Sequence, residues 1–512
     1  MKSGDFRSTY GTLRFLVEIT HNSGTIQLGA ERSSTANELD QNIFEITDNV
    51  KIFKGKNTFT IGTHNEFFNF RNLLINNLNG RWRFGNLADF YANQPRQFEV
   101  TFPADKTTAR PSAEFKAAQL GFYVQDEIQV NPKFRLTAGL RVDMPVINSK
   151  PGYNKIVDST FEGKYNTQNI PNKQLLFAPR VGFNYDVAGD RSVIVRGGIG
   201  IFSGRVPFVW ISNQFSNTGL LLRTTSQVDN TPTQAPFGVN NGEGFNPNVN
   251  EQSNIGSGGN SFEVNLIDKN FKLPQVLRFN AASDIKIPGG INLTFETMFS
   301  KTINNVLYQD VNLTAPVGVV DPVYNNGFDK RIAFATSTNA RRKNPVITNA
   351  ILITNTNEGY TLNLGATINK TWKHFFTQLA YNFNSATDVN SGASSTAFSN
   401  WEFVQVVGSP NEPQLATSNY QLQHRITGIF SFNMDYIKHL RTSFALFYNG
   451  NSGQPFTYLI NGDLNSDGRF GNDLMYVPRN PGEIKFVDRV NSQQQVIATA
   501  AQQSADFEAF YS

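Results

Sequence analysis

The stretch Leu120–Asp143 reads LGFYVQDEIQVNPKFRLTAGLRVD and contains a complete amphipathic β-hairpin. Apolar side chains at Phe122, Val124 and Ile128 alternate with polar ones up to a turn at 131–133, after which the alternation resumes. A period of two is typical of a strand with one apolar and one polar face. Because a soluble β-sandwich and a membrane barrel both show it, the way the unit recurs decides the fold.

The unit recurs along the chain, with short turns inside the hairpins and long connections between them. The hairpins are expected near 43–70, 120–143, 177–202, 276–299, 360–383 and 422–448. The connections cover 72–119, 148–175, 204–272, 302–358 and 384–420. Loops this long without structure of their own are uncommon in compact soluble domains. Strands of about ten residues, with short turns at one end and long loops at the other, are typical of outer-membrane β-barrels.

The sequence therefore predicts an all-β fold over residues 1–512: an antiparallel transmembrane β-barrel with short periplasmic turns and long extracellular loops. The chain has 44 Phe and 16 Tyr but a mean hydropathy of only -0.35, which fits aromatic side chains on the lipid face and polar ones in the lumen and loops. No run of 18 apolar residues suggests a transmembrane helix.

Composition also excludes several functions. Without Cys, the chain has no disulfide, thiolate metal site or thiol catalysis. A net charge of +4 from 45 basic and 41 acidic residues argues against a nucleic-acid partner. No G-x-S-x-G motif is present, and we do not expect an enzyme.

The two ends of the sequence predict that it is the middle section of a longer protein. The first twelve residues, MKSGDFRSTYGT, lack the apolar segment of a secretory signal, although a barrel protein must be exported. Residues 491–512 are polar and helix-prone and do not form a final amphipathic strand. We therefore expect a partial barrel.

Several segments resemble TonB-dependent outer-membrane receptors, and in particular the Oar-like branch common in Bacteroidetes. Besides the 120–143 hairpin, they are FKGKNTFTIGTHNEFFNFRNLLI (53–75), APRVGFNYDVAGDRSVIVRGGIGIFSGRVP (178–207), PQVLRFNAASDIKIPGGI (274–291) and NGDLNSDGRFGNDLMYVP (461–478). Such receptors are generally barrels of about 22 strands, of which about twelve are accounted for here.

The resemblance also implies a cell location and partners. It implies energised transport across the outer membrane of a Gram-negative bacterium. Outer-membrane lipid and the TonB complex would be partners, the latter through a plug that this sequence lacks. A surface lipoprotein is a further candidate partner.

One segment, DLNSDGRFGND at 463–473, has the pattern of a calcium loop. Oxygen donors at alternate positions, with Gly468 at the sixth, are how a short loop wraps Ca²⁺. The expected ligands are Asp463, Asn465, Asp467, Arg469 through its carbonyl, and Asp473. Position twelve is Leu474 in place of the bidentate Glu of an EF-hand. The alternative is a polar extracellular turn that needs no metal.

Six arginines are expected to face the lumen, because they take the parity opposite to the aliphatic side chains of their strands. They are Arg135, Arg141, Arg180, Arg196, Arg278 and Arg425. An arginine on the lipid face costs roughly 2–4 kcal/mol at the midplane, which favours this orientation. They would contact plug carboxylates or water, or else the substrate. The five histidines are scattered, and no metal site is expected among them.

Two classes of function are open. In the first, the protein is a TonB-dependent transporter of a large polar nutrient: a peptide or protein, a glycan or a siderophore. Loops rich in Asn, Gly, Thr and aromatic residues, such as 227–261, suit such a ligand. In the second, the protein is a non-transporting surface barrel, an adhesin or an extracellular β-rich binding protein.

Overall fold

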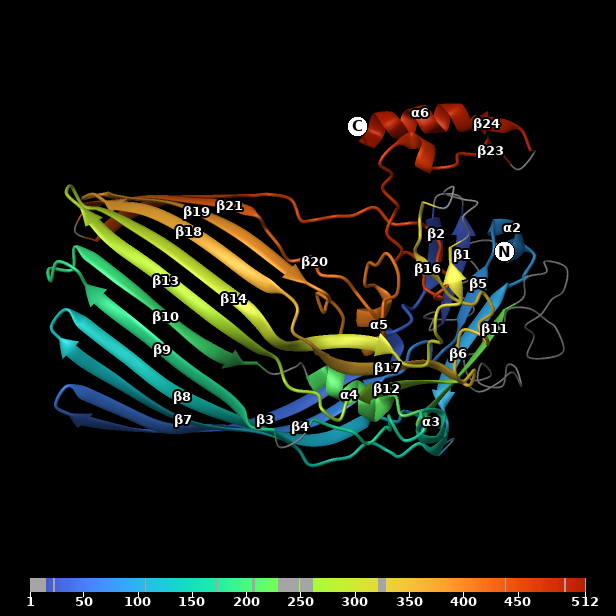
Figure 1. The fold of residues 1–512 in the computed structure, drawn as a ribbon, viewed down its shortest axis with the longest axis horizontal. Helices are drawn as coiled ribbons and strands as arrows, with labels where there is room; N and C mark the ends of the chain where they lie inside the picture. Colours follow the sequence, from blue (N-terminus) through green and yellow to red (C-terminus); the bar gives the residue numbers. More distant parts are fainter. Residues whose placement is uncertain are drawn as a thin grey trace.

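Twelve strands form one curved antiparallel sheet, the wall, in the computed structural model (Figure 1). The structure describes residues 15–21, 24–105, 107–171, 174–204, 208–228, 248, 261–320, 328–437, 439–491 and 494–511. The wall strands are β3 (Asn37–Lys54), β4 (Asn57–Leu74), β7 (Ala113–Asn131), β8 (Phe134–Ile147), β9 (Leu176–Asp186), β10 (Val193–Ser203), β13 (Gln275–Ile287), β14 (Ile291–Asp310), β18 (Tyr360–Thr371), β19 (Phe375–Asp388), β21 (His424–Ile437) and β22 (Leu440–Asn451). Each is paired with its sequence neighbour in the wall, which confirms the predicted fold class and excludes a sandwich.

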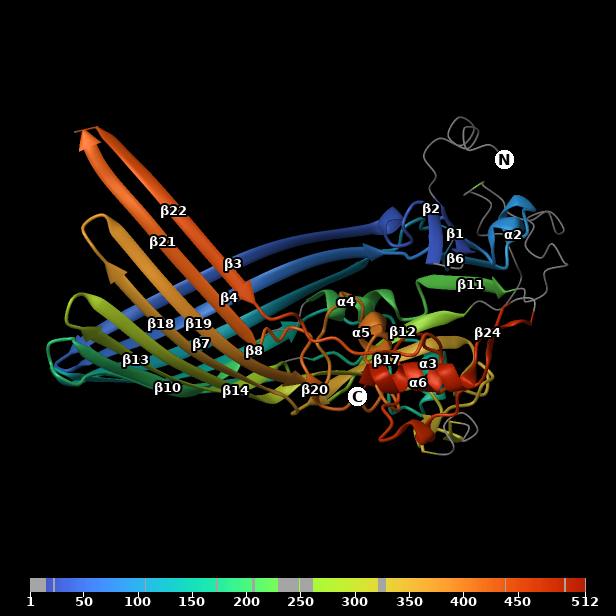
Figure 2. The same cartoon turned by 90° about the horizontal axis from the view of Figure 1, so that it is seen from above.

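The short turns all lie at one end of the wall and the long connections at the other, here named the turn end and the loop end (Figures 1 and 2). A hairpin is present at each of the six expected places, with longer strands than expected at several of them. The hairpin of β3 and β4, for example, extends from residue 37 to residue 74 in continuous register. Because the short turns all lie at one end, the two ends of the wall can be told apart.

The long connections have structure of their own, which corrects the expectation from the sequence. A second sheet has the order β11-β6-β5-β1-β2, and its strands are β1 (Leu16–His21), β2 (Gly24–Gly29), β5 (Arg81–Phe84), β6 (Gln97–Pro103) and β11 (Leu222–Val228). Two pairings outside the twelve-stranded path are parallel: β1 with β5, and β12 (Phe262–Ile267) with β17 (Ile347–Thr356). The alternating pattern of the wall does not predict these strands, because they are short, of four to ten residues, and β12 and β17 are buried on both faces.

Short helices and strands complete the structure. They are α2 (Leu87–Tyr91), α3 (Lys155–Thr160), α4 (Phe208–Ser216), α5 (Ala397–Glu402), α6 (Ala500–Tyr511), η1 (Ser34–Ala36), η3 (Pro481–Glu483), β15 (Gly318–Val319), β16 (Ile332–Ala333), β20 (Ala416–Thr417), β23 (Arg489–Val490) and β24 (Val496–Ala498). None of the described helices has both the length and the apolar composition needed to span a membrane. Helix α6 lies in the C-terminal stretch that the sequence marked as helix-prone.

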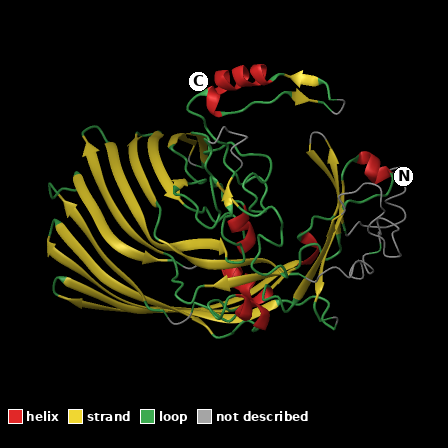
Figure 3. Ribbon diagram, turned by 45° about the vertical axis from the view of Figure 1, so that its right-hand side comes forward, coloured by secondary structure: helices red, strands yellow, loops and turns green. Residues whose placement is uncertain are grey.

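The largest core lies at the loop end, where α4 and α5 pack within the curve of the wall (Figure 3). The rings of Phe115 on β7 and Phe215 on α4 are stacked with centroids 4.7 Å apart. Trp401 on α5 is 1% exposed in the same core. This aromatic packing fixes the connections against the wall, so the loop end is a folded layer.

Candidate functional site

The six predicted arginines lie on one face of the wall, here named the arginine face. Residues paired across an antiparallel ladder share a face. Arg135 and Arg196 are both paired with Asn184, Arg180 and Arg278 are both paired with Gly200, and Arg141 lies two residues beyond Gly139, the other partner of Arg180. The register from Arg278 through β14, β18 and β19 places Arg425 on this face as well. It is the face that α4 covers at the loop end, where Phe68 and Phe70 contact Phe208.

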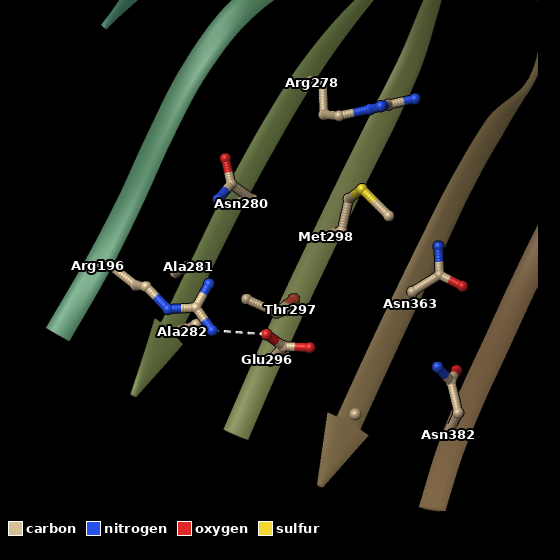
Figure 4. A pocket seen from close by; sticks show the side chains of 11 residues that line it. Arg196, Arg278, Asn280, Ala281, Ala282, Glu296, Thr297, Met298, Asn363 and Asn382 are labelled. Atoms are coloured by element: carbon tan, nitrogen blue, oxygen red, sulfur yellow. Dashed lines mark hydrogen bonds and ion pairs between the residues drawn. The ribbon is translucent and has the colours of Figure 1, made fainter. Parts of the chain in front are cut away.

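Three of these arginines form ion pairs within the wall. Arg196 contacts Glu296 at 2.7 Å (Figure 4). Arg196 also contacts Asp284 at 3.1 Å. Arg141 contacts Asp143 at 2.7 Å, and Arg135 lies 3.9 Å from Glu127. The Arg196–Asp284 and Arg135–Glu127 pairs join neighbouring strands, and the Arg196–Glu296 pair reaches from β10 past β13 to β14, so these pairs link strands of the wall. The Arg141–Asp143 pair lies within β8.

The other three, Arg180, Arg278 and Arg425, form no ion pair with the residues that the structure describes. The guanidinium groups of Arg180 and Arg278 lie over the ring of Phe202, at 5.0 and 5.5 Å from its centroid. Arg278 also donates a hydrogen bond to Ser300, and Arg425 to Asn449. These three cations keep hydrogen-bonding capacity for an anionic partner, because a guanidinium has five donors.

Two hollows open on the arginine face. The first, of about 360 Å³, is lined by Arg196, Arg278, Glu296 and side-chain amides from β13, β18 and β19 (Figure 4). The second, of about 400 Å³, is lined by His64, Tyr123, Arg141 and Arg180 among others. Both hollows are open, and both have charged side chains in their lining, so they can receive water, a polar ligand or another polar protein surface.

The sequence analysis missed a cluster around His64. Its Nδ1 lies 2.8 Å from the hydroxyl of Thr47 and 3.4 Å from Glu45, and its Nε2 lies 4.0 Å from Glu66. Among the described residues, this is the one group of three His, Asp or Glu side chains whose ligand atoms all lie within 4.8 Å of one another. The cluster could have been predicted from the register of the first hairpin, since pairing Lys54 with Asn57 at the turn brings Glu45 opposite Glu66.

The 463–473 loop is folded around its own acidic side chains. Asp463 accepts a hydrogen bond from the backbone of Gly468, and Asp473 accepts one from Leu464. Asp467 accepts bonds from the Arg469 backbone at 2.7 Å and from the Asn472 amide at 3.0 Å. Burial, together with the nearby charges of Asp463 and Asp473, raises the pKa of Asp467 to about 6. The loop therefore holds negative charge in a poorly solvated place.

Three buried oxygens of this loop have no hydrogen-bond partner among the described residues: Asp463 Oδ1, Asn472 Oδ1 and Asp473 Oδ1. Asp473 is completely buried, and its Oδ1 lies 3.6 Å from Nη1 of the buried Arg331. The three carboxylates do not form a group with all ligand atoms within 4.8 Å, since only the His64 cluster does so in the described part of the chain.

A further hollow of about 340 Å³, here named the loop pocket, lies at the loop end between residues 388 and 419. Its lining includes Asn, Gln, Ser and Thr residues, of which Ser399 and Asn400 belong to α5, Thr417 belongs to β20 and the others belong to the connections between the elements. Phe403, which is 64% exposed, provides an aromatic surface. The sequence analysis did not single out this segment. The ligand loop that it did name, 227–261, lies almost wholly outside the described residues, as does the segment 1–12.

The wall is antiparallel and has an apolar outer face and a charged inner face. Short turns lie at one end and a folded loop layer lies at the other. These features together define an outer-membrane β-barrel. Residues 9–510 match the family described as "Outer membrane beta barrel domain", and the chain belongs to this family. It is a protein of the Gram-negative outer membrane, so the turn end faces the periplasm and the loop end faces outward.

Solved structures with a similar fold are outer-membrane transporters and receptors. The transporter YddB from Escherichia coli is 10% identical with a TM-score of 0.44, over 82% of this chain and 44% of its own. The ferric enterobactin receptor PfeA from Pseudomonas aeruginosa, solved as a mutant, is 10% identical with a TM-score of 0.41, over 88% and 45%. The FrpB iron transporter from Neisseria meningitidis is 8% identical with a TM-score of 0.37, over 78% and 42%. The chain thus spans less than half the length of these three proteins. No curated protein matches the sequence.

The stability of the barrel is expected to respond differently to an added arginine on the two faces of the wall. Phe295 is 50% exposed on the outer face of β14, and Met298 lies on the arginine face of the same strand beside the first hollow. We expect Phe295→Arg to destabilise the barrel in lipid by about 2–4 kcal/mol, because the charge enters hydrocarbon. Met298→Arg should change stability little. Urea unfolding of the full-length protein in vesicles measures both, and equal losses would contradict the assignment of the faces.

Proposed function

We propose that this chain forms part of the barrel and the extracellular layer of a TonB-dependent transporter of the Oar-like branch, which imports a large polar nutrient. The observation that carries the proposal is the arginine face, with two polar hollows and three arginines that lack a carboxylate partner among the described residues. Outer-membrane barrels have a polar interior, and in a transporter this interior must offer polar groups to a hydrated ligand or to a plug.

The partners follow from the same proposal. Outer-membrane lipid contacts the outer face of the wall, and the TonB complex acts through a plug that the arginine face receives. Arg180, Arg278 and Arg425 supply positive charge to carboxylates of that plug. A surface lipoprotein covering the loop end is a further partner in the proposal, and nucleic acid is not.

A second candidate function is adhesion without transport. The sheet of β1, β2, β5, β6 and β11 supports it, because it lies outside the wall and all six residues of its edge strand β2 are exposed. An exposed edge strand can pair with a strand of another protein.

The two candidates differ in their need for energy. Cells with the full-length protein, cells without it and cells lacking functional TonB are incubated with fluorescein-labelled peptides and oligosaccharides. If the protein is a transporter, internal label requires both the protein and TonB. If it is an adhesin, the protein increases surface label whether or not TonB works, and internal label does not change. An Arg180→Gln, Arg278→Gln variant should reduce uptake several-fold, whereas the exposed Arg441→Gln should not.

The same proposal includes a Ca²⁺ ion at the 463–473 loop. Support comes from the oxygen pattern of the sequence and from the buried, unpartnered oxygens of Asp463, Asn472 and Asp473. A divalent cation would offset the repulsion among the carboxylates of Asp463, Asp467 and Asp473, of which Asp473 lies near the Arg331 guanidinium. Asp463, Asn465, Asp467 and Asp473 would hold the ion through side chains and Arg469 through its carbonyl.

The pH dependence of this loop should reverse with calcium. Without metal, the raised pKa of Asp467 favours the folded loop at low pH, and this contribution is lost as the pH rises through about 6. With about 5 mM Ca²⁺ we expect more protection at pH 7.5 than at pH 5, because protons compete with the ion. Hydrogen exchange of residues 463–474 in the full-length protein measures this. If the protection of this loop shows the same pH trend with calcium and with EDTA, the proposed calcium site is contradicted.

A further inference from the structure

The loop pocket has the chemistry of a site for hydroxyl groups. Its lining contains five side-chain amides, four Ser or Thr hydroxyls, one carboxylate from Asp388 and the exposed ring of Phe403. An amide offers donors and acceptors together, so it pairs with hydroxyls, which also do both. An aromatic face gives area for the apolar face of a ring.

The charge of the pocket narrows the ligand class. No Lys, Arg or His belongs to its lining among the described residues, and Asp388 brings a negative charge. An anionic ligand would enter without a cationic partner and would be repelled by this carboxylate. A neutral ligand has no such cost. The pocket therefore differs from the arginine face, whose positive charge suits anions.

The framework of the pocket is held by buried and partly buried hydrogen bonds to other elements. Trp401 donates to Asn411 at 2.8 Å, and Asn411 in turn bonds the backbone of Asp310 at the end of β14. Asn400 donates to the Tyr308 hydroxyl, and Trp210 of α4 donates to the Ser394 carbonyl. A pocket held in this way keeps its shape without ligand, which lowers the entropy cost of binding.

Other amides in the pocket are not used by the framework. Asn390 and Asn400 are engaged in local hydrogen bonds, but the side chains of Gln405, Gln414 and Asn419 are exposed and form no hydrogen bond with the part of the chain that the structure describes. These three amides and the ring of Phe403 are the groups that an incoming ligand meets. All four residues line one hollow, so they can contact one ligand together.

We infer that the loop pocket binds a neutral glycan, with Phe403 stacked on a sugar ring and with Gln405, Gln414 and Asn419 bonded to its hydroxyls. The inference deepens the proposed function and rests on it for the role of the glycan as a nutrient. Binding itself requires neither TonB nor a plug, so the two proposals can fail separately.

Purified full-length receptor in detergent is applied to a printed array of neutral oligosaccharides, acidic oligosaccharides and peptides. The best neutral ligand is then titrated by calorimetry. We expect Phe403→Ala to weaken its binding by about tenfold or more, and Gln414→Ala by about threefold to tenfold, the range of one lost hydrogen bond. Phe403→Trp should keep the affinity, because it keeps the aromatic face. Phe456→Ala, another exposed aromatic outside the pocket, is the matched control.

Heat-modified mobility on gels confirms that each variant is a folded barrel. The inference is overturned if no neutral glycan gives a signal that Phe403→Ala removes, or if acidic glycans or peptides bind better in a Phe403-dependent way. If a neutral glycan binds through Phe403 but is not taken up with TonB, the pocket stands and the transport proposal fails. If label is imported with TonB while Phe403→Ala has no effect on any ligand, transport stands and the pocket fails.

Discussion

Arg331→Met is expected to destabilise the loop end locally by about 3–5 kcal/mol, because it leaves buried charge without a partner. The Arg331 side chain is 1% exposed and contacts Asp329 at 2.9 Å and Asp473 at 3.6 Å. It also donates to the Leu474 carbonyl at 2.8 Å. Methionine fills a similar volume but offers no donor, so both carboxylates and the carbonyl lose a partner.

Hydrogen exchange of the full-length protein measures this loss as faster exchange in residues 328–335 and 464–474. Arg441→Met is the matched control, since its ion pair with Asp435 is exposed on both sides and contributes little. If amide exchange in these residues is no faster in Arg331→Met than in Arg441→Met, then water already reaches the Arg331 ion pairs. That result would contradict the burial of Arg331.

Trp401→Ala is the second large effect, expected at about 3–5 kcal/mol for a fully buried aromatic side chain. Trp401 fills the core below the loop pocket, bonds Asn411 and lies 5.6 Å from the guanidinium of Arg469. Its loss removes both the packing and the hydrogen bond that hold 388–411 to β14. We therefore expect the pocket to lose its shape, and glycan binding to fall further than with Phe403→Ala.

Hydrogen exchange of residues 397–411 and calorimetry with the same glycan check this prediction. Trp372→Ala is the control, because this tryptophan is 46% exposed at the turn end. Stable exchange rates together with lost binding in Trp401→Ala would contradict the structural role given to Trp401, because they would place it at the ligand.

Local patterns explain why the wall could be predicted from the sequence. Each wall hairpin combines an alternation of period two with a short turn, and both are visible in stretches of about twenty residues. The turn also fixes the register. The contacts of His64 with Glu45 and Glu66 could have been predicted by extending the register of the first hairpin.

The loop pocket could not be predicted in this way. It depends on contacts between residues far apart in the chain, such as Gln309 with Asn411 and Trp210 with Ser394. No periodic pattern marks 388–419, and its helix α5 is too short to be recognised by an apolar stripe. The buried partners of the 463–473 loop, such as Arg331, are hidden from the sequence for the same reason.

Strand β14 belongs to two structures at once. Residues 291–304 are paired with β13, and 291–301 also with β18, in the membrane wall, while residues 305–310 are paired with β17 in the loop layer. At about 3.3 Å per residue, its twenty residues reach about 65 Å without a break. Tyr308 and Asp310, which form hydrogen bonds with Asn400 and Asn411, are therefore on the same strand as Glu296 of the arginine face. Hydrogen bonds thus join the segment that forms the loop pocket to a strand that continues into the membrane wall. A ligand bound in the loop pocket would lie on a support that is continuous with the arginine face.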